Sequence, residues 1–255
     1  MKPDDRRRAI IEHLVEVGSE TLEALSARFD VSKMTIHRDL DDLEGEGLLR
    51  KVRGGATIEA SNQFESDFRY RARVGTEDKA RIAATAARLI QPGTSVLIDD
   101  GSTTQALVPH LLDCRPLTVI TNSQGVIRGL TDAHGIELIA LGGSFSRKFD
   151  GYFGGLTLAA LRTLRADTAL LSSSAVDGRT AYHQDAEVAE VKRRMIASAA
   201  RSYLLVDRAK FGRTALHVMC DLDAFDGIVT SADLDPETAR DLRDRGIDLT
   251  IASEE

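Results

Sequence analysis

The sequence predicts an α/β protein in two parts, a small N-terminal unit of helices with a hairpin and a larger domain built on a mostly parallel sheet. Apolar residues first recur at helical spacing, and from residue 77 onward short apolar strands alternate with amphipathic helices. With 255 residues, 42% of them hydrophobic, the chain is long enough for two cores. The predicted domains are 1–58 and 77–255, joined by a linker over 59–76.

The N-terminal unit is predicted to hold three helices followed by two short strands. The apolar periodicity places the helices at residues 4–17, 22–28 and 33–46. Gly18 ends the first helix, and Thr21 and Ser32 are suited to cap the other two. Apolar and cationic residues around Gly54-Gly55 then predict a hairpin.

The charge of this unit bears on its partner. The chain carries a net charge of −7, and residues 1–58 contain 10 Lys and Arg against 12 Asp and Glu. Any affinity for DNA must therefore come from local placement. A three-helix unit of this kind is also compatible with a protein-interaction module. The cations on the outer face of the third helix and on the hairpin favour DNA, because such a helix enters the major groove and the hairpin meets phosphates. The residues expected to contact DNA are Ser32, Lys33, Thr35, His37 and Arg38 on the helix, and Arg50, Lys51 and Arg53 on the hairpin.

A long motif runs through the third helix and the hairpin. It reads Val31-Ser32-x-x-Thr35-Ile36-x-Arg38-Asp39-Leu40-x-x-Leu43-x-x-x-Gly47-Leu48-Leu49-Arg50-x-Val52-x-Gly54-Gly55-Ala56. This pattern resembles the winged helix-turn-helix of the DeoR/GlpR family of bacterial regulators. The chain has His37 where that family usually has arginine, and Arg53 where it usually has histidine. The resemblance implies a winged helix that binds double-stranded operator DNA.

Residues 59–76 change in character. They lack an apolar period and hold Phe64 and Phe68 among several arginines. Two interpretations stay open, a linker that docks partly on the next domain and a flexible spacer.

The second domain is predicted to gather polar turns at one edge of its sheet. The strand 96–98 is followed by a turn at Gly101 and a helix over 103–112. Such a turn can bind an anion at the helix N-terminus, although for the turn taken alone a simple helix cap is the favoured explanation of its hydroxyl residues. Parallel strands carry their ligands beyond their carboxyl ends. The turns at 99–104, 121–123 and 142–143 all occupy such positions and are expected to line one pocket.

Further motifs in this domain resemble the sensor domain of the same family. They are Asp99-x-Gly101-Ser102-Thr103-Thr104, Thr121-Asn122-Ser123, Gly142-Gly143, Glu187-x-x-x-x-Lys192 and Asp207-x-x-Lys210-Phe211-Gly212. That fold is related to ribose 5-phosphate isomerase and usually binds a phosphorylated sugar or related metabolite. The resemblance implies that the turn 101–104 holds a phosphate with help from Lys210. The remaining implied pocket residues are Asp99, Asn122, Ser123, Gly142, Gly143, Asp177, Glu187 and Lys192.

Several classes of protein are disfavoured by composition. Cys114 and Cys220 give neither a disulfide framework nor a metal spacing, and no segment has the length of a membrane span. We therefore expect a cytoplasmic protein with no metal, no cofactor and no membrane partner. Two functions are compared. One is a ligand-responsive regulator, expected to be a repressor of a sugar or carbohydrate operon and a homodimer or homotetramer. The other is a sugar-phosphate isomerase with Glu187 or Asp177 as general base; residues 1–58 favour the regulator, because an isomerase has no need of them.

Overall fold

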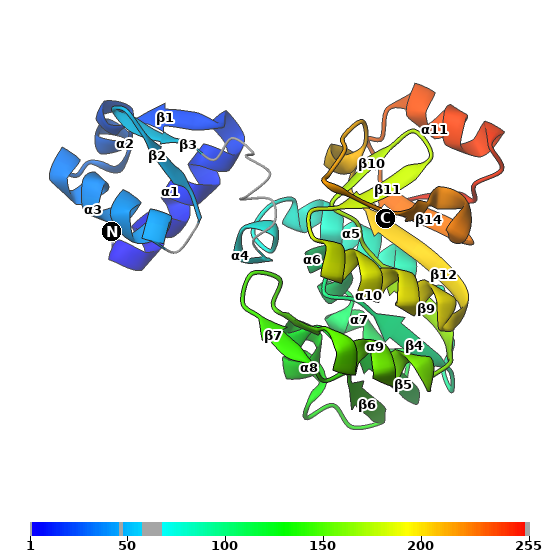
Figure 1. The fold of residues 1–255 in the computed structure, drawn as a ribbon. Coiled ribbons are helices and arrows are strands. Elements are labelled where there is room, and N and C mark those ends of the chain that lie inside the picture. Colours follow the sequence, from blue (N-terminus) through cyan, green and yellow to red (C-terminus); the bar gives the residue numbers. More distant parts are fainter. Residues whose placement is uncertain (1, 46–47, 58–67, 253–255) are drawn as a thin grey trace. The chain divides into compact units, whose positions relative to one another are not determined.

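The structure is a computed structural model that describes residues 2–45, 48–57 and 68–252. Its contacts divide the chain into two compact units, Met1–Val74 and Gly75–Glu255 (Figure 1). The first unit contains α1 (Pro3–Val17), β1 (Ser19–Thr21), α2 (Leu22–Phe29), α3 (Lys33–Gly45), β2 (Arg50–Val52), β3 (Gly55–Thr57) and α4 (Phe68–Arg71). The predicted linker thus contains one short helix, and its residues 59–67 lie outside the described part of the chain.

The three N-terminal helices begin and end where side-chain chemistry places their boundaries. Gly18, with φ 78°, terminates α1. Thr21 accepts a hydrogen bond from the backbone N–H of Ala24 at 3.1 Å, which caps α2. Ser32 accepts one from the N–H of Thr35 at 3.2 Å at the start of α3. The predicted helices and both caps are confirmed. The predicted stop at Gly47 lies outside the described residues.

The hairpin belongs to a three-stranded sheet, which the sequence did not predict. Its order is β1-β3-β2, with both pairs antiparallel. β1 approaches β3 so closely that a Cβ on Gly55 would lie 2.2 Å from the carbonyl oxygen of Glu20. Glycine at this position therefore lets the hairpin β2–β3, the predicted wing, pack against β1, the segment before α2.

The second unit is built around a seven-stranded parallel sheet of order β15-β14-β12-β9-β4-β5-β6. The mostly parallel sheet is confirmed. Its helices are α5 (Thr76–Ala87), α6 (Ser102–Gln105), α7 (Val108–Leu111), α8 (Gln124–Leu130), α9 (Gly155–Arg162), α10 (Ala186–Ala197), η1 (Arg208–Lys210), η2 (Leu222–Ala224) and α11 (Pro236–Asp244). Its strands are β4 (Ser95–Ile98), β5 (Leu117–Thr121), β6 (Ile136–Ala140), β7 (Ser144–Ser146), β8 (Gly151–Phe153), β9 (Ala166–Leu171), β10 (Ala175–Asp177), β11 (Thr180–His183), β12 (Ala199–Val206), β13 (His217–Asp221), β14 (Gly227–Ser231) and β15 (Leu249–Ala252).

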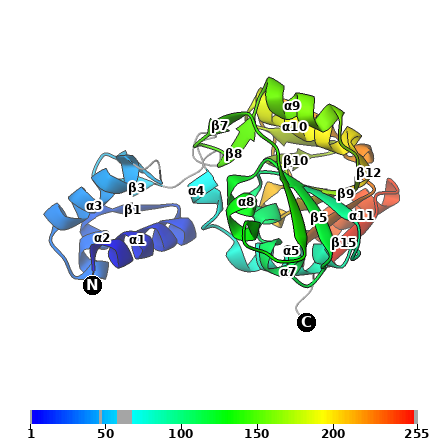
Figure 2. The ribbon, with the colours of Figure 1, turned by 90° about the horizontal axis from the view of Figure 1, so that it is seen from below.

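Helices cover both faces of this sheet, so its strands are apolar on both sides. α9 and α10 lie on one face and α5 and α7 on the other (Figure 2). Along β4, Leu97 packs into the core beneath α9 and α10, whereas Val96 and Ile98 pack into the core beneath α5. This alternation explains why β4 appears in the sequence as a continuous apolar run.

Two regions differ from the sequence-based expectations. The helix expected over 103–112 is divided into α6 and α7. Pro109 has no backbone N–H to donate to Gln105, which prevents one continuous helix. In addition, the hairpins β7–β8 and β10–β11, the strand β13 and the helix α9 were not predicted. Among the described helices, none combines the length and the hydropathy needed to cross a bilayer.

Candidate functional site

Helix α3, which the sequence predicts to be the DNA-recognition helix, separates a buried face from an exposed one. Ile36, Leu40 and Leu43 are buried in the core of the first unit. Lys33, His37 and Arg38 are exposed, whereas Thr35 is half-buried. In the wing, Arg50 and Arg53 are exposed and Lys51 is half-buried. The structure therefore leaves the predicted DNA-contacting cations at the surface of one unit.

Several of these cations are held by carboxylates of the same unit. Lys33 forms an ion pair with Glu23, and Lys51 forms one with Asp41. Asp41 also lies 3.1 Å from Nδ1 of His37, so one carboxylate connects the recognition helix to the wing. Hydrogen bonds from Lys51 and His37 lower the pKa of Asp41. Exposed ion pairs are weak, so separating these partners costs little free energy.

One N-terminal cation, Arg6, is buried and stabilises the fold of the first unit. Arg6 and Asp39 are buried, and the guanidinium donates to both carboxylate oxygens, at 2.5 and 3.1 Å. This bidentate pair joins α1 to α3 and raises the pKa of Arg6, chiefly through the hydrogen bond to Asp39. It thereby helps to fix the orientation of the recognition helix.

Asp99 is the centre of a buried polar cluster at the carboxyl end of β4. Its carboxylate accepts hydrogen bonds from the N–H of Gly101 at 2.9 Å, from Thr104 Oγ1 at 2.5 Å and from the N–H of Ser172 at 2.6 Å. Lys192, on α10, completes the cluster with an ion pair to Asp99. Residues from β4, α6, α10 and the end of β9 are thus brought together.

The lysine in this cluster is fixed in place by three partners. Lys192 is 1% exposed, and its Nζ contacts Asp99, lies 3.3 Å from Asp100 and donates to Ser172 Oγ at 3.2 Å. Burial alone would raise the pKa of Asp99. The Lys192 ammonium and the hydrogen bonds from Thr104 and Ser172 outweigh this effect and hold the pKa below its usual value. The surroundings of Asp99 therefore favour its charged carboxylate form.

The turn after β4 is more tightly packed than its sequence indicates. A Cβ on Gly101 would lie 2.1 Å from Ser172 Oγ and 2.9 Å from Thr104 Oγ1. Glycine is required here by the approach of these two side chains. The N–H of Gly101 and the hydroxyl of Thr104 are both directed to Asp99. Within the predicted turn, the hydroxyls of Ser102 and Thr103 take no part in these hydrogen bonds to Asp99, and Ser102 is half-buried.

The next polar turn follows β5 and contributes an amide. Asn122 is fully buried, and its Nδ2 donates to the Tyr152 carbonyl at 3.1 Å. Its Oδ1 is buried and accepts no hydrogen bond from the residues that the structure describes. Ser123 accepts a hydrogen bond from the N–H of Val126 and caps α8. A buried amide oxygen of this kind is suited to accept a hydrogen bond from a hydroxyl group of a bound ligand.

Other predicted pocket residues occupy different settings. Gly142 accepts a hydrogen bond from Thr157, and a Cβ on Gly143 would lie 2.3 Å from the Phe153 carbonyl oxygen. Glu187 is exposed in the first turn of α10. Asp177 is exposed in the β10–β11 hairpin, which belongs to a separate three-stranded sheet. Lys210 is half-buried in η1, after β12. Gly142, Gly143, Glu187 and Asp177 take no part in the hydrogen bonds of the Asp99 cluster described above, and the ligand contacts of these four residues and of Lys210 stay predictions.

Two residues of this cluster, and one buried histidine elsewhere in the second unit, were missed from the sequence. Ser172 directly follows a buried strand, and this position is the one signal that could have identified it. Asp100 is fully buried beside Lys192. His183 is buried against the ring of Phe149, with centroids 5.6 Å apart. Nothing in the sequence around His183 indicates this, because β10, β11 and β13 were not predicted.

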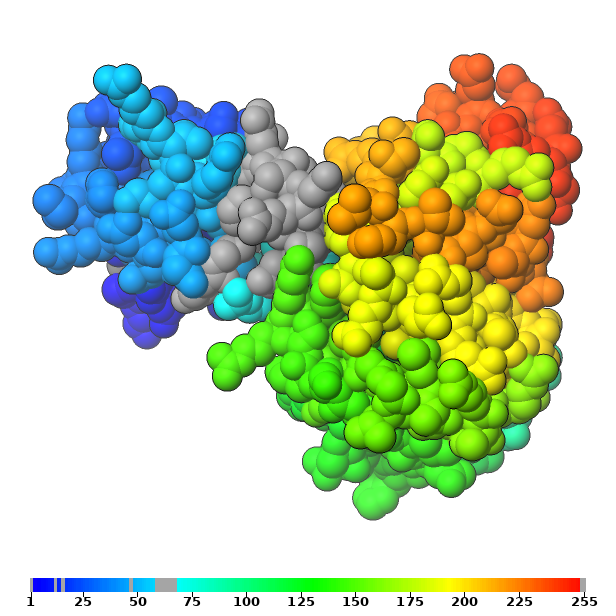
Figure 3. Space-filling view, viewed as in Figure 1, coloured from blue at the N-terminus to red at the C-terminus, as the bar shows by residue number. Residues whose placement is uncertain are grey.

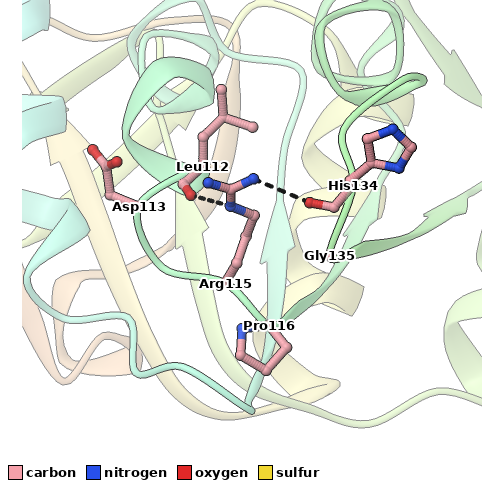
Figure 4. A pocket seen from close by; sticks show the side chains of 6 residues that line it. All are labelled: Leu112, Asp113, Arg115, Pro116, His134 and Gly135. Atoms are coloured by element: carbon pink, nitrogen blue, oxygen red, sulfur yellow. Dashed lines mark hydrogen bonds between the residues drawn. The ribbon is translucent and has the colours of Figure 1, made fainter.

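A surface depression lies at the other end of the sheet strands. It is lined by Leu112, Asp113, Arg115, Pro116, His134 and Gly135, which precede β5 and β6 (Figure 4). Arg115 donates to the His134 carbonyl at 3.3 Å, so its guanidinium is engaged by the chain itself. Among the described residues, no group of three or more His, Cys, Asp or Glu is arranged to hold a metal ion.

The two units define a class of protein, a DNA-binding transcriptional regulator with a winged helix-turn-helix and an α/β sensor domain. Residues 6–62 match the DeoR-like helix-turn-helix domain, and residues 75–232 match the DeoR C terminal sensor domain. The chain belongs to the DeoR family of transcriptional regulators.

Relatives of the whole chain support the same assignment. The chain is 34% identical to the uncharacterized HTH-type transcriptional regulator YgbI of Escherichia coli K12, over 100% of both chains. It is 31% identical to the glycerol-3-phosphate regulon repressor of the same strain, over 98% of this chain and 100% of the relative. Among solved structures, a D-ribose-5-phosphate isomerase with phospho-erythronic acid gives a TM-score of 0.40 at 16% identity, over 53% of this chain and 54% of the other. A likeness at that level carries no argument about activity.

Proposed function

We propose that this regulator is a repressor of a carbohydrate operon and that a phosphorylated sugar or related metabolite modulates its binding to DNA. The winged helix offers the exposed Lys33 on α3 and the half-buried Lys51 on β2, each held by an exchangeable ion pair. A relative of full length is named a repressor of a glycerol-3-phosphate regulon. The observation that carries the effector site is the Asp99 cluster, which fixes the polar turn after β4 against the end of β9 at one edge of the sheet.

Within this site the phosphate is assigned to the start of α6. The backbone N–H groups of Ser102 and Thr103 have no acceptor within so short a helix, and both residues carry hydroxyl donors. The Asn122 Oδ1 atom, which has no hydrogen-bond donor among the described residues, is assigned to accept a hydrogen bond from a sugar hydroxyl. Asp99 and Lys192 are assigned a positioning role, because each is already saturated by the other and by the turn.

The alternative, an isomerase, has weaker support. Its candidate bases, Glu187 and Asp177, are both exposed. Neither has the desolvated surroundings that general bases commonly use. A sugar phosphate that binds and is recovered unchanged after prolonged incubation would exclude this alternative for that compound.

The effector assignment is tested by thermal melting against a panel of sugar phosphates. A ligand at 100 times its dissociation constant adds about 2.7 kcal/mol to the free energy of unfolding. Thr103→Ala should weaken binding by about 0.5–3 kcal/mol, the value of one hydrogen bond to a charged group. Thr163→Ala, in an exposed turn after α9, is the matched control. Equal effects of the two variants would place the phosphate elsewhere.

Linkage gives a second test. If the effector weakens operator binding by some factor, operator must weaken effector binding by the same factor. Calorimetric titration of the effector with and without operator measures this factor directly. Equal effector affinities in the two titrations would mean that the ligand does not control DNA binding.

The working unit is proposed to be a dimer or a tetramer. One small winged helix makes few phosphate contacts, and two-fold pairing doubles them. Light scattering of the operator complex should therefore give at least twice the 27.7 kDa of one chain. A single chain that binds its operator tightly would refute the proposal.

A further inference from the structure

The recognition helix carries an exposed apolar side chain among its charges. Met34 is 65% exposed, more than Val17 at 48% or Val52 at 41%, the other large exposed apolar residues described in the first unit. Its neighbours on α3 include Lys33, which is paired with Glu23 at the surface. Residues of α3 and β2, coloured mid-blue to cyan in Figure 3, form much of the visible surface of this unit.

The position of Met34 on the helix determines what it faces. α3 begins at Lys33, so Met34 lies in the first turn. It precedes the buried Ile36 by two residues. At 3.6 residues per turn this places the two side chains about 200° apart around the helix axis, so Met34 points away from the core. It precedes Arg38 by four residues and therefore shares a face with it. In a helix-turn-helix, the N-terminal part of this second helix meets the base edges.

The chemistry of the major groove then limits the partner of Met34. A thioether side chain neither donates a useful hydrogen bond nor carries charge. The apolar group that B-DNA exposes in the major groove is the C5-methyl of thymine. A base edge that offers only donors and acceptors would be desolvated against Met34 without compensation. An A·T pair is thereby favoured over a G·C pair at this position.

We propose that Met34 determines specificity by packing against the C5-methyl group of a thymine, next to the base that Arg38 contacts. The inference rests on the proposed use of α3 as the DNA-binding helix. It adds an apolar contact with a base to a set of residues that otherwise contact DNA through charge and hydrogen bonds.

The test uses DNA in which the methyl group alone is removed. Operator sequences are first selected from a random duplex library with the full-length protein. Each thymine of the selected duplex is then replaced, one at a time, by deoxyuridine. At one thymine in each half-site, wild-type affinity should fall about fourfold, which corresponds to about 0.8 kcal/mol for one buried carbon group.

The variant experiment assigns that loss to Met34. Met34→Ala should bind the thymine and deoxyuridine duplexes equally, whereas Met34→Leu should keep part of the discrimination. Val52→Ala, at an exposed apolar residue of the wing, is the matched control and should keep all of it. Full discrimination by Met34→Ala, or equal binding of every deoxyuridine duplex by wild type, would overturn the inference. In both cases sequence selection by the wild type would leave the DNA-binding function standing. Failure to select any sequence would remove both.

Discussion

The same ion pair, a lysine with an aspartate, occurs in both units in opposite surroundings. In the first unit, the side chains of Lys51 and Asp41 are 24% and 53% exposed. In the second, those of Lys192 and Asp99 are 1% and 0% exposed. Water and salt screen the first pair, so its partners separate at small cost. The second pair is removed from water, so losing either partner would leave the other charge buried without compensation, at a large cost in free energy.

This difference separates two uses of charge. A surface lysine with an exchangeable partner can pair with another anion, and under the proposed function that anion is a DNA phosphate. A buried lysine with three fixed partners cannot, and it serves to shape the turn around Asp99. Of the two lysines compared, only Lys51 is therefore available to a partner of the protein, whereas Lys192 is part of the scaffold of the candidate effector site.

The largest expected effect comes from breaking the buried pair. Lys192→Met should lower the free energy of unfolding of the second unit by about 3–5 kcal/mol, because Asp99 is left buried without its partner. Urea denaturation at neutral pH measures this. Lys51→Met is the matched control and should leave stability almost unchanged. The double variant Lys192→Met, Asp99→Asn should recover part of the loss. Equal losses from Lys192→Met and Lys51→Met would contradict the comparison.

Lowering the pH should also reveal the contribution of the buried pair to stability. The pKa of Asp99 is lower in the folded protein than in the unfolded chain. Its contribution to stability is therefore complete above the unfolded value, near 3.9, and is lost as the pH falls through the folded value. Urea denaturation at successive pH values below 5 should show this loss in the wild type. The double variant Lys192→Met, Asp99→Asn should lose less over the same range, and an identical acid profile would assign the effect to other carboxylates.

Among the exposed cations, Arg38 should matter most for sequence recognition. It is exposed on α3, on the face opposite Ile36, Leu40 and Leu43. If it contacts a guanine, Arg38→Ala should cost about 1–3 kcal/mol and relax specificity at one base position. Gel-shift titrations on specific and scrambled duplexes measure both quantities. Equal losses on the two duplexes would make Arg38 a phosphate contact.

A smaller and uniform effect is expected from Lys51. Lys51→Ala should weaken binding to all sequences by about the same factor and should reduce the slope of log affinity against log salt by about 1. The same titrations at several salt concentrations provide the test. If neither Lys51→Ala nor Arg38→Ala changed binding, α3 and the wing would not be the DNA-binding surface.

Local chemistry made much of the architecture predictable. The helices of the first unit follow from apolar periodicity, and their boundaries follow from Gly18, Thr21 and Ser32, whose effects act within a few residues. The parallel sheet followed from the alternation of buried strands and amphipathic helices. In each case the evidence lies close together in the chain, so the sequence alone was sufficient for the two cores, the winged helix and the grouping of polar turns at strand ends.

Tertiary structure decided what those turns contain. The approach of Ser172 to Gly101, the ion pair of Lys192 with Asp99 and the burial of Asn122 join residues from separate strands and helices. No local pattern encodes these contacts, because they depend on the order of strands in the sheet. The same holds for the charges: Arg6 and Lys51 are both cations of the first unit in the sequence, but only packing leaves Lys51 paired at the surface and buries Arg6 against Asp39. Desolvation is set by the whole fold, and it determines whether a charge can bind a partner or only hold the protein together.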